Sequence, residues 1–237
     1  MAYIEGFVLA VPAGNKEAYR KTATDALPRF KEYGALRLVE AWGDDVPGGK
    51  VTDFKGAVKA QPDEVVVFSW IEYPDKATRD KANERMMADP AMKEGMKDMP
   101  FDPQRMIYAG FAPLNDEGRR SRPGYIDGFL AAVPTANKDA YCEFVAQHAK
   151  LLQEFGATRV VDAWGDDVPP GETTDYQRAV KANGDETVVF SWIEWPSKEA
   201  RVQGWQKAIS DPRMQNQQMP FDGRRVIYGG FAPIVDE

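Results

Sequence analysis

The chain has 237 residues, 30 of them basic and 37 acidic, which gives a formal net charge of −7. Its 43% hydrophobic and 28% charged residues are typical of a folded globular protein, and the length fits one large domain or two small ones. The negative charge argues against binding to nucleic acid, which requires a basic face, and no apolar run reaches the ~20 residues that span a bilayer.

The first residues carry an acid, Glu5, and no basic segment, so we expect no signal peptide. A single cysteine, Cys142, excludes an internal disulfide and is typical of a reducing compartment. We therefore expect a cytoplasmic protein that has no contact with membranes.

The sequence contains an internal duplication. YIEGFVLAVP starts at Tyr3 and YIDGFLAAVP at Tyr125, 122 residues later, and AWGDDVP at Ala41 recurs at Ala163 with the same offset. VVFSWIEYP and MPFD recur in the same order. A period this long indicates a duplicated domain rather than a solenoid repeat. We expect a first repeat at 1–114, a polar linker at 115–124 and a second repeat at 125–237.

In chain order, each repeat reads strand, helix, strand, strand, helix, strand. The apolar spacing of the first helix places Tyr19, Ala23, Ala26 and Phe30 on one face, and Gly34 ends it. A polar loop, 43–64, is expected to lie outside the core. In the first repeat the six elements correspond to residues 3–11, 16–33, 35–42, 65–73, 76–89 and 105–111.

This order is that of a ferredoxin-like βαββαβ unit. Both faces of the strand at 65–73 are largely apolar, so we expect helices on one face and the sister repeat on the other. The predicted fold class is α+β, with the two ferredoxin-like repeats packed sheet to sheet as an intramolecular dimeric α+β barrel. Further self-association stays open.

The motifs of both repeats resemble the domain of unknown function 1428 family, the YbaA-like proteins. The resemblance rests on YIEGFV, AWGDDVP, ETVVFSWIEWP and MPFDGRRVIYGGF, and it covers nearly the whole chain. It implies a dimeric α+β barrel and carries no catalytic residue, because the family has no established activity. The wider barrel group contains cofactor-free monooxygenases, haem-degrading enzymes, lactone isomerases and small-molecule binders.

Acidic residues on strands are the first catalytic candidates, because a carboxylate beside an indole in a dry pocket gains a raised pKa and can act as an acid or base. They are Glu40 and Glu72 and their counterparts Asp162 and Glu194. The alternative is a structural ion pair with nearby arginines. Basic and aromatic residues that could line a pocket are Arg37, Trp70, Arg105, Tyr108, Arg159, Trp192, Arg225 and Tyr228.

His148 is the single histidine, and the first repeat has Ala26 at the same place. It could be a ligand or a base, or a histidine that is simply packed in the core. Asp44-Asp45 and Asp166-Asp167 offer too few oxygens for a hard cation, so turns are the better interpretation. We expect no metal and no cofactor.

Three functions stay open. The first is a barrel that binds a small apolar or aromatic molecule, with or without catalysis. The second, by analogy of fold alone, is a cofactor-independent monooxygenase. The third is a non-catalytic interaction module, which an exposed apolar patch would indicate.

Overall fold

The computed structural model describes residues 1–95, 98–215 and 218–237. The first repeat contains β1 (Tyr3–Pro12), α1 (Lys16–Glu32), β2 (Arg37–Asp45), α2 (Phe54–Ala57), β3 (Glu64–Tyr73), α3 (Lys76–Ala88), α4 (Pro90–Gly95) and β4 (Ile107–Gly118). The second contains β5 (Tyr125–Pro134), α5 (Lys138–Glu154), β6 (Arg159–Asp167), α6 (Tyr176–Ala179), β7 (Glu186–Trp195), α7 (Lys198–Ser210), α8 (Pro212–Gln215) and β8 (Ile227–Asp236).

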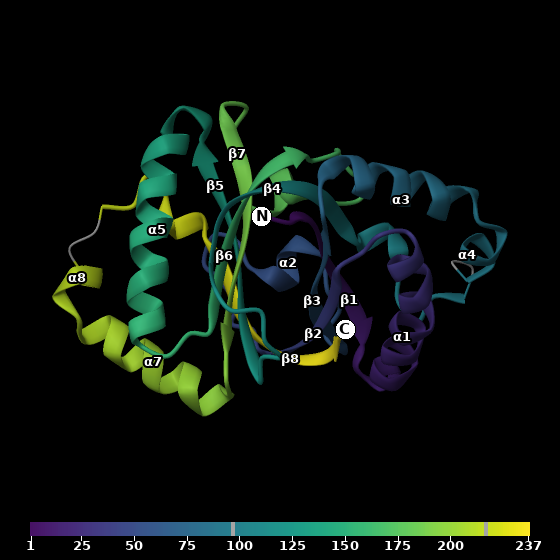
Figure 1. Cartoon of the computed structure of the whole chain (residues 1–237), viewed down its shortest axis with the longest axis horizontal. Coiled ribbons are helices and arrows are strands. Elements are labelled where there is room, and N and C mark those ends of the chain that lie inside the picture. Colours follow the sequence, from purple (N-terminus) through teal and green to yellow (C-terminus); the bar gives the residue numbers. More distant parts are fainter. Residues whose placement is uncertain (96–97, 216–217) are drawn as a thin grey trace.

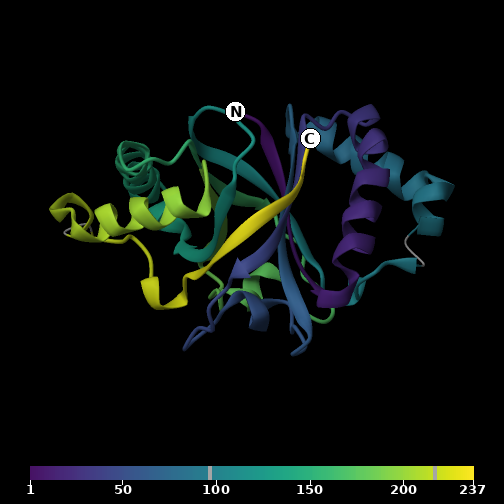
Figure 2. The same ribbon diagram turned by 90° about the horizontal axis from the view of Figure 1, so that it is seen from below.

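The eight long strands close into one barrel, in the order β1-β3-β2-β8-β5-β7-β6-β4. Each repeat supplies a ferredoxin-like four-stranded sheet, and the α+β barrel predicted from the sequence is confirmed. The sheets also join at their edges, because β4 pairs with β6 and β8 pairs with β2. Helices α1 and α3 of the first repeat cover one flank of the barrel, and α5 and α7 of the second cover the opposite flank (Figures 1 and 2).

Capping residues and a glycine mark where helices begin and end. Asp75 and Ser197 cap α3 and α7, accepting hydrogen bonds from the amides of Thr78 and Ala200. Gly34 has φ +102° just after α1, as a residue that ends a helix in the left-handed region does. The end of β4 lies at Gly118, so the segment between the last strand of one repeat and the first of the next is 119–124.

Aromatic side chains fill the barrel. Phe68 and Phe190 stack at 4.5 Å between ring centroids, and Trp70 and Trp192 stack at 4.3 Å. The segment 43–64 was expected outside the core, and that expectation is wrong. Its helix α2 buries Phe54 and Ala57 inside the barrel, and α6 of the other repeat buries Tyr176 and Ala179 there. Although most of the segment is polar, these few apolar residues fill the barrel interior.

Among the described residues, no helix combines the length and the apolar character needed to cross a bilayer.

Candidate functional site

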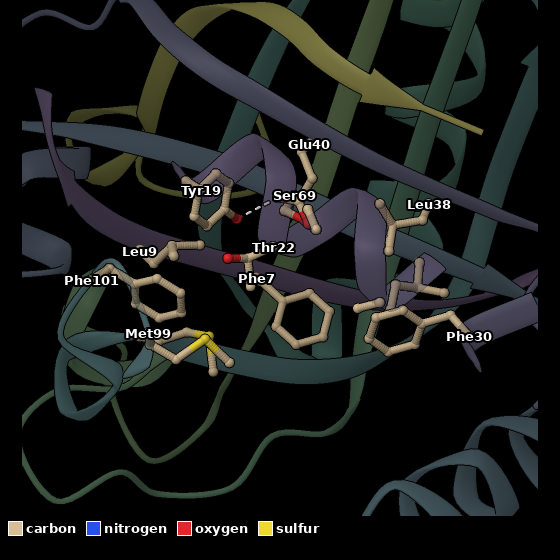
Figure 3. A pocket seen from close by; sticks show the side chains of 14 residues that line it. Phe7, Leu9, Tyr19, Thr22, Phe30, Leu38, Glu40, Ser69, Met99 and Phe101 are labelled. Carbon is tan, nitrogen blue, oxygen red and sulfur yellow. Dashed lines mark hydrogen bonds between the residues drawn. The ribbon is translucent and has the colours of Figure 1, made fainter. Parts of the chain in front are cut away.

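A pocket lies between α1 and the outer face of the barrel in the first repeat, which we call the α1 pocket. Its volume is about 190 Å³. Strands β1, β2 and β3 form its floor, and α1 forms one wall (Figure 3). Met99 and Phe101, from the segment that precedes β4, close it. The lining is apolar apart from Thr22 and the central position where Tyr19, Glu40 and Ser69 meet.

Glu40 is the carboxyl group of the α1 pocket. Alternation along β2 places Glu40 on the face that looks toward the helix, opposite Ser69 of β3. The hydroxyl of Tyr19, from α1, donates to Glu40 Oε2 at 2.6 Å. Burial raises the pKa of Glu40 to about 7, because the charged form loses its water, although the bonds from Tyr19 and Ser69 oppose the rise.

The second repeat has a matching pocket under α5, the α5 pocket, of about 220 Å³. Asp162 takes the place of Glu40, and Tyr141 that of Tyr19. The hydroxyl of Tyr141 lies 3.5 Å from Asp162 Oδ1, and the amide of Asn115 lies 3.4 Å from Oδ2. Burial raises the pKa of Asp162 to about 6.

Asn115 makes the two carboxyl groups different. It lies on β4, which crosses to pair with β6 of the other repeat, directly beside Asp162. At the equivalent place on β8, Val235 pairs with Glu40, and its side chain offers no donor. Asn115 was placed in the predicted linker, and no local pattern in the sequence connects it with Asp162. From the sequence, Tyr19 was predicted only as a member of an apolar helix face.

His148 lies on the wall of the α5 pocket, and its counterpart Ala26 lies on the wall of the α1 pocket. Its ring packs against Phe144 at 4.1 Å between centroids. His148 Nδ1 lies 3.3 Å from the carbonyl oxygen of Phe144, which accepts a hydrogen bond in the tautomer that carries its hydrogen on Nδ1. Within the described ranges, no group of three or more His, Cys, Asp or Glu residues is arranged to hold a metal ion.

Glu72 and Glu194 belong to a different part of the molecule, a buried ion-pair network at one end of the barrel. Glu72 lies 2.7 Å from Arg159, and Glu194 lies 2.7 Å from Arg37. Burial disfavours the charge of Glu72, but Arg159, Arg120 and Arg37 together hold its pKa below the usual value. Trp70 and Trp192 each donate to the glutamate two residues ahead, at 3.3 and 3.1 Å. The ion-pair alternative describes these two acids.

The remaining candidates lie outside both pockets. Arg105 forms an ion pair with Glu64, the first residue of β3, and Arg225 forms one with Glu186, the first residue of β7. Tyr108 and Tyr228 are 49% and 53% exposed.

The acidic pairs at 44–45 and 166–167 end β2 and β6 rather than forming isolated turns. Asp44 accepts a hydrogen bond from Tyr125 at 2.7 Å, and Asp166 accepts one from Tyr3 at 2.9 Å. Asp45 pairs with Arg201 and Asp167 with Arg79. The acids therefore connect one repeat to the other.

Comparison with solved structures supports the fold. A protein described as a candidate monooxygenase from Fusobacterium nucleatum subsp. nucleatum superposes with a TM-score of 0.60 at 11% identity, covering 100% of this chain and 94% of the other. An anthrone oxidase-like protein superposes with a TM-score of 0.57, also at 11% identity, covering 100% and 92%.

Sequence comparison identifies the family. The uncharacterized protein YbaA of Escherichia coli (strain K12) is 62% identical over 117 residues, which are 49% of this chain and 100% of YbaA. One repeat thus has the length of a whole YbaA chain. The profile of the protein family of unknown function DUF1428 matches residues 2–103 and again 124–223. The chain therefore belongs to the DUF1428 family and carries its domain twice.

Proposed function

We propose that the chain binds small apolar or aromatic molecules that carry one hydrogen-bonding group, in the α1 and α5 pockets. The observation behind this proposal is a buried carboxyl group in each otherwise apolar pocket. In the described part of the chain, neither Glu40 nor Asp162 forms an ion pair with Lys or Arg, and each meets a tyrosine hydroxyl instead. A buried carboxyl group without a cation is costly for folding, so a ligand role explains its presence.

The pocket volumes set the size of the ligand. An engineered apolar cavity of about 150 Å³ holds one benzene ring. Pockets of about 190 and 220 Å³ therefore suit one ring or two fused rings. Because the pKa of Glu40 is about 7, its carboxyl group both accepts and donates hydrogen bonds near neutral pH. Hydroxyl and carbonyl groups on the ligand are equally suitable partners.

The proposal is tested with 2-naphthol and naphthalene, which differ by one hydroxyl group. Isothermal titration should show tighter binding of 2-naphthol, by about tenfold, since one buried hydrogen bond to a charged or ionisable group contributes about 1.5 kcal/mol. The double variant Glu40→Gln/Asp162→Asn should reduce that preference about threefold, because a neutral amide forms a weaker hydrogen bond than an ionised carboxyl group, and keep naphthalene binding. Glu117→Gln, an exposed carboxylate on β4, is the matched control. Absence of binding by both compounds would refute the proposal.

Proton abstraction is a second candidate function, favoured by Glu40. A carboxylate with a pKa near 7 is suited to take a proton from a quinol, and the ionised quinol reacts more readily with O₂. The names of the two structural neighbours, which share the fold, point to oxidation of this kind. For 1,4-naphthohydroquinone, one oxygen atom would enter the ring to give 2-hydroxy-1,4-naphthoquinone and the other would leave as water, with the substrate supplying four electrons.

Oxygen consumption with 1,4-naphthohydroquinone tests this second candidate against the uncatalysed rate. Catalysis should fall at least tenfold in Glu40→Gln and be retained in Glu117→Gln. A rate equal to that without protein would leave binding as the function. If neither binding nor catalysis occurs, the interaction-module hypothesis takes precedence.

We also propose that the protein works in the cytoplasm, because Cys142 is its single cysteine. We expect no nucleic acid partner because of its net charge of −7.

A further inference from the structure

The two pockets differ most on their helical walls. Thr22 and Ala26 line the α1 pocket, and the α5 pocket has Phe144 and His148 at these places. Trp205 of α7 adds an indole to the α5 pocket, where the first repeat has Asn83. The indole is fixed, because Trp205 Nε1 donates to Asp127 Oδ2 at 2.8 Å.

These changes add three rings, those of Phe144, His148 and Trp205, to the two phenylalanines that the α5 pocket shares with the α1 pocket, Phe221 in place of Phe101 and Phe129 in place of Phe7. The ring centroid of Phe144 lies 4.1 Å from that of His148 and 5.6 Å from that of Phe221, which it meets edge-on. The ring centroids of Trp205 and Phe129 lie 6.4 Å apart. The pocket is nevertheless no smaller than the α1 pocket, at about 220 against about 190 Å³. Flat ring systems gain additional attraction between such walls, which a puckered saturated ring does not.

The hydrogen bonds of the buried carboxyl groups also differ between the two pockets. Tyr19 holds Glu40 at 2.6 Å, whereas the contacts of Asp162 with Tyr141 and Asn115 are long, at 3.5 and 3.4 Å. Hydrogen bonds at these longer distances are weak. The Asp162 carboxylate, which Ser191 also faces, therefore retains the capacity to accept a further hydrogen bond from an N–H or O–H group of a ligand.

We propose that the α5 pocket is a second, non-equivalent site, selective for planar aromatic molecules of one or two rings that carry an N–H or O–H donor. The α1 pocket has the smaller Thr22 and Ala26 at these two places, with Phe30 as a ring on the same helix, and discriminates less between planar and puckered rings. The inference rests on the proposed function, since it requires that the pockets bind small molecules. It adds a division of ligand classes between the repeats.

The test compares 2-naphthol with trans-2-decalol, which has the same carbon skeleton and hydroxyl group but saturated, puckered rings. Met99 lines the α1 pocket and Met219 the α5 pocket, so their ¹³C-methyl signals report on each pocket separately. The Trp205 indole N–H signal is a second reporter for the α5 pocket. We expect 2-naphthol to shift the Met219 and Trp205 signals at a concentration at least tenfold lower than trans-2-decalol. The concentrations at which the two compounds shift the Met99 signal should differ less, by under threefold.

Exchange of wall residues between repeats supplies the matched variants. Phe144→Thr/His148→Ala should reduce the preference at Met219 at least fivefold and leave Met99 unchanged. His148→Ala alone, which removes one ring and leaves Phe144, should reduce it partly and serves if the double variant does not fold. Equal response of Met219 to both compounds would overturn the inference and leave the proposed function intact. No response of any reporter to either compound would refute both.

Discussion

Arg159 of the second repeat donates to Glu72 of the first at 2.7 Å, and both side chains are buried. The mate of this contact, Arg37 with Glu194, has the same length and runs in the opposite sense. Such reciprocity is what two copies of one surface produce when they meet about a two-fold axis. The interface between the repeats is therefore that of a symmetric dimer, contained in one chain.

Loss of Arg159 should destabilise the protein strongly. Arg159→Met leaves Asp116 and part of the charge on Glu72 without a partner, and removal of one member of a buried pair costs about 3–5 kcal/mol. Urea unfolding measures the change. The control is Arg120→Gln, because Arg120 also pairs with Glu72 but is 44% exposed, and its loss should cost less than about 1 kcal/mol. Similar values for both variants would contradict the assignment of the network.

Glu40 should make stability fall as pH rises. Its pKa is about 7 in the folded protein and 4.5 as the unperturbed value, so the folded state binds more protons between these values. Stability is therefore greatest below pH 4.5 for this group, declines up to pH 7 and is constant above. Glu40→Gln should remove the decline between pH 6 and 7, leave the part below pH 6 that Asp162 contributes, and stabilise the protein above pH 7 by up to about 3 kcal/mol. Thermal unfolding between pH 5 and 8 tests this, and a slope unchanged by the substitution would show that another group is responsible.

Asn115 should determine how the two carboxyl groups differ. Asn115→Val copies the residue at 235 and removes a donor from Asp162, so the pKa of Asp162 should rise toward that of Glu40. Val235→Asn should lower the pKa of Glu40. Carboxyl ¹³C chemical shifts followed by NMR titration report both groups. If the pKa of Asp162 does not move in Asn115→Val, Asn115 has no part in it, and burial together with Ser191 and Tyr141 sets it.

Gly128 should tolerate no side chain. A Cβ at this position would lie 2.9 Å from the ring of Phe68, whose own stacking on Phe190 leaves it little room. Gly128→Ala should cost about 1–3 kcal/mol through overpacking. A methyl group at Gly14 would meet nothing within 4 Å, so Gly14→Ala is the control and should be near neutral. Equal effects would mean that the barrel interior rearranges easily.

The duplication, the order of strands and helices and the α+β barrel could all be predicted. Repeated motifs, the apolar spacing of the first helix and the two apolar faces of the strand at 65–73 are all visible in the sequence. The roles of Glu40 and Glu72 could not be separated in the same way. Both are acids next to a tryptophan on a strand, yet Glu72 meets arginine from the other repeat and Glu40 meets a tyrosine hydroxyl. The partner of Glu72 depends on how the two repeats join, and that of Glu40 depends on how α1 packs on its own sheet. The same reason hid Asn115, which reaches Asp162 only because β4 crosses into the second sheet.

The two-fold arrangement also bears on the order of the chain. Seven residues, 118–124, connect Glu117 to Tyr125, and by symmetry the same span separates Glu237 from Tyr3. Since Met1 and Ala2 already lie in that span, about five added residues should reach across. A circularly permuted protein that begins at Tyr125 and passes through this new connection into the first repeat would then have the same contacts in a different succession. The contacts of this barrel therefore do not require either repeat to come first in the chain.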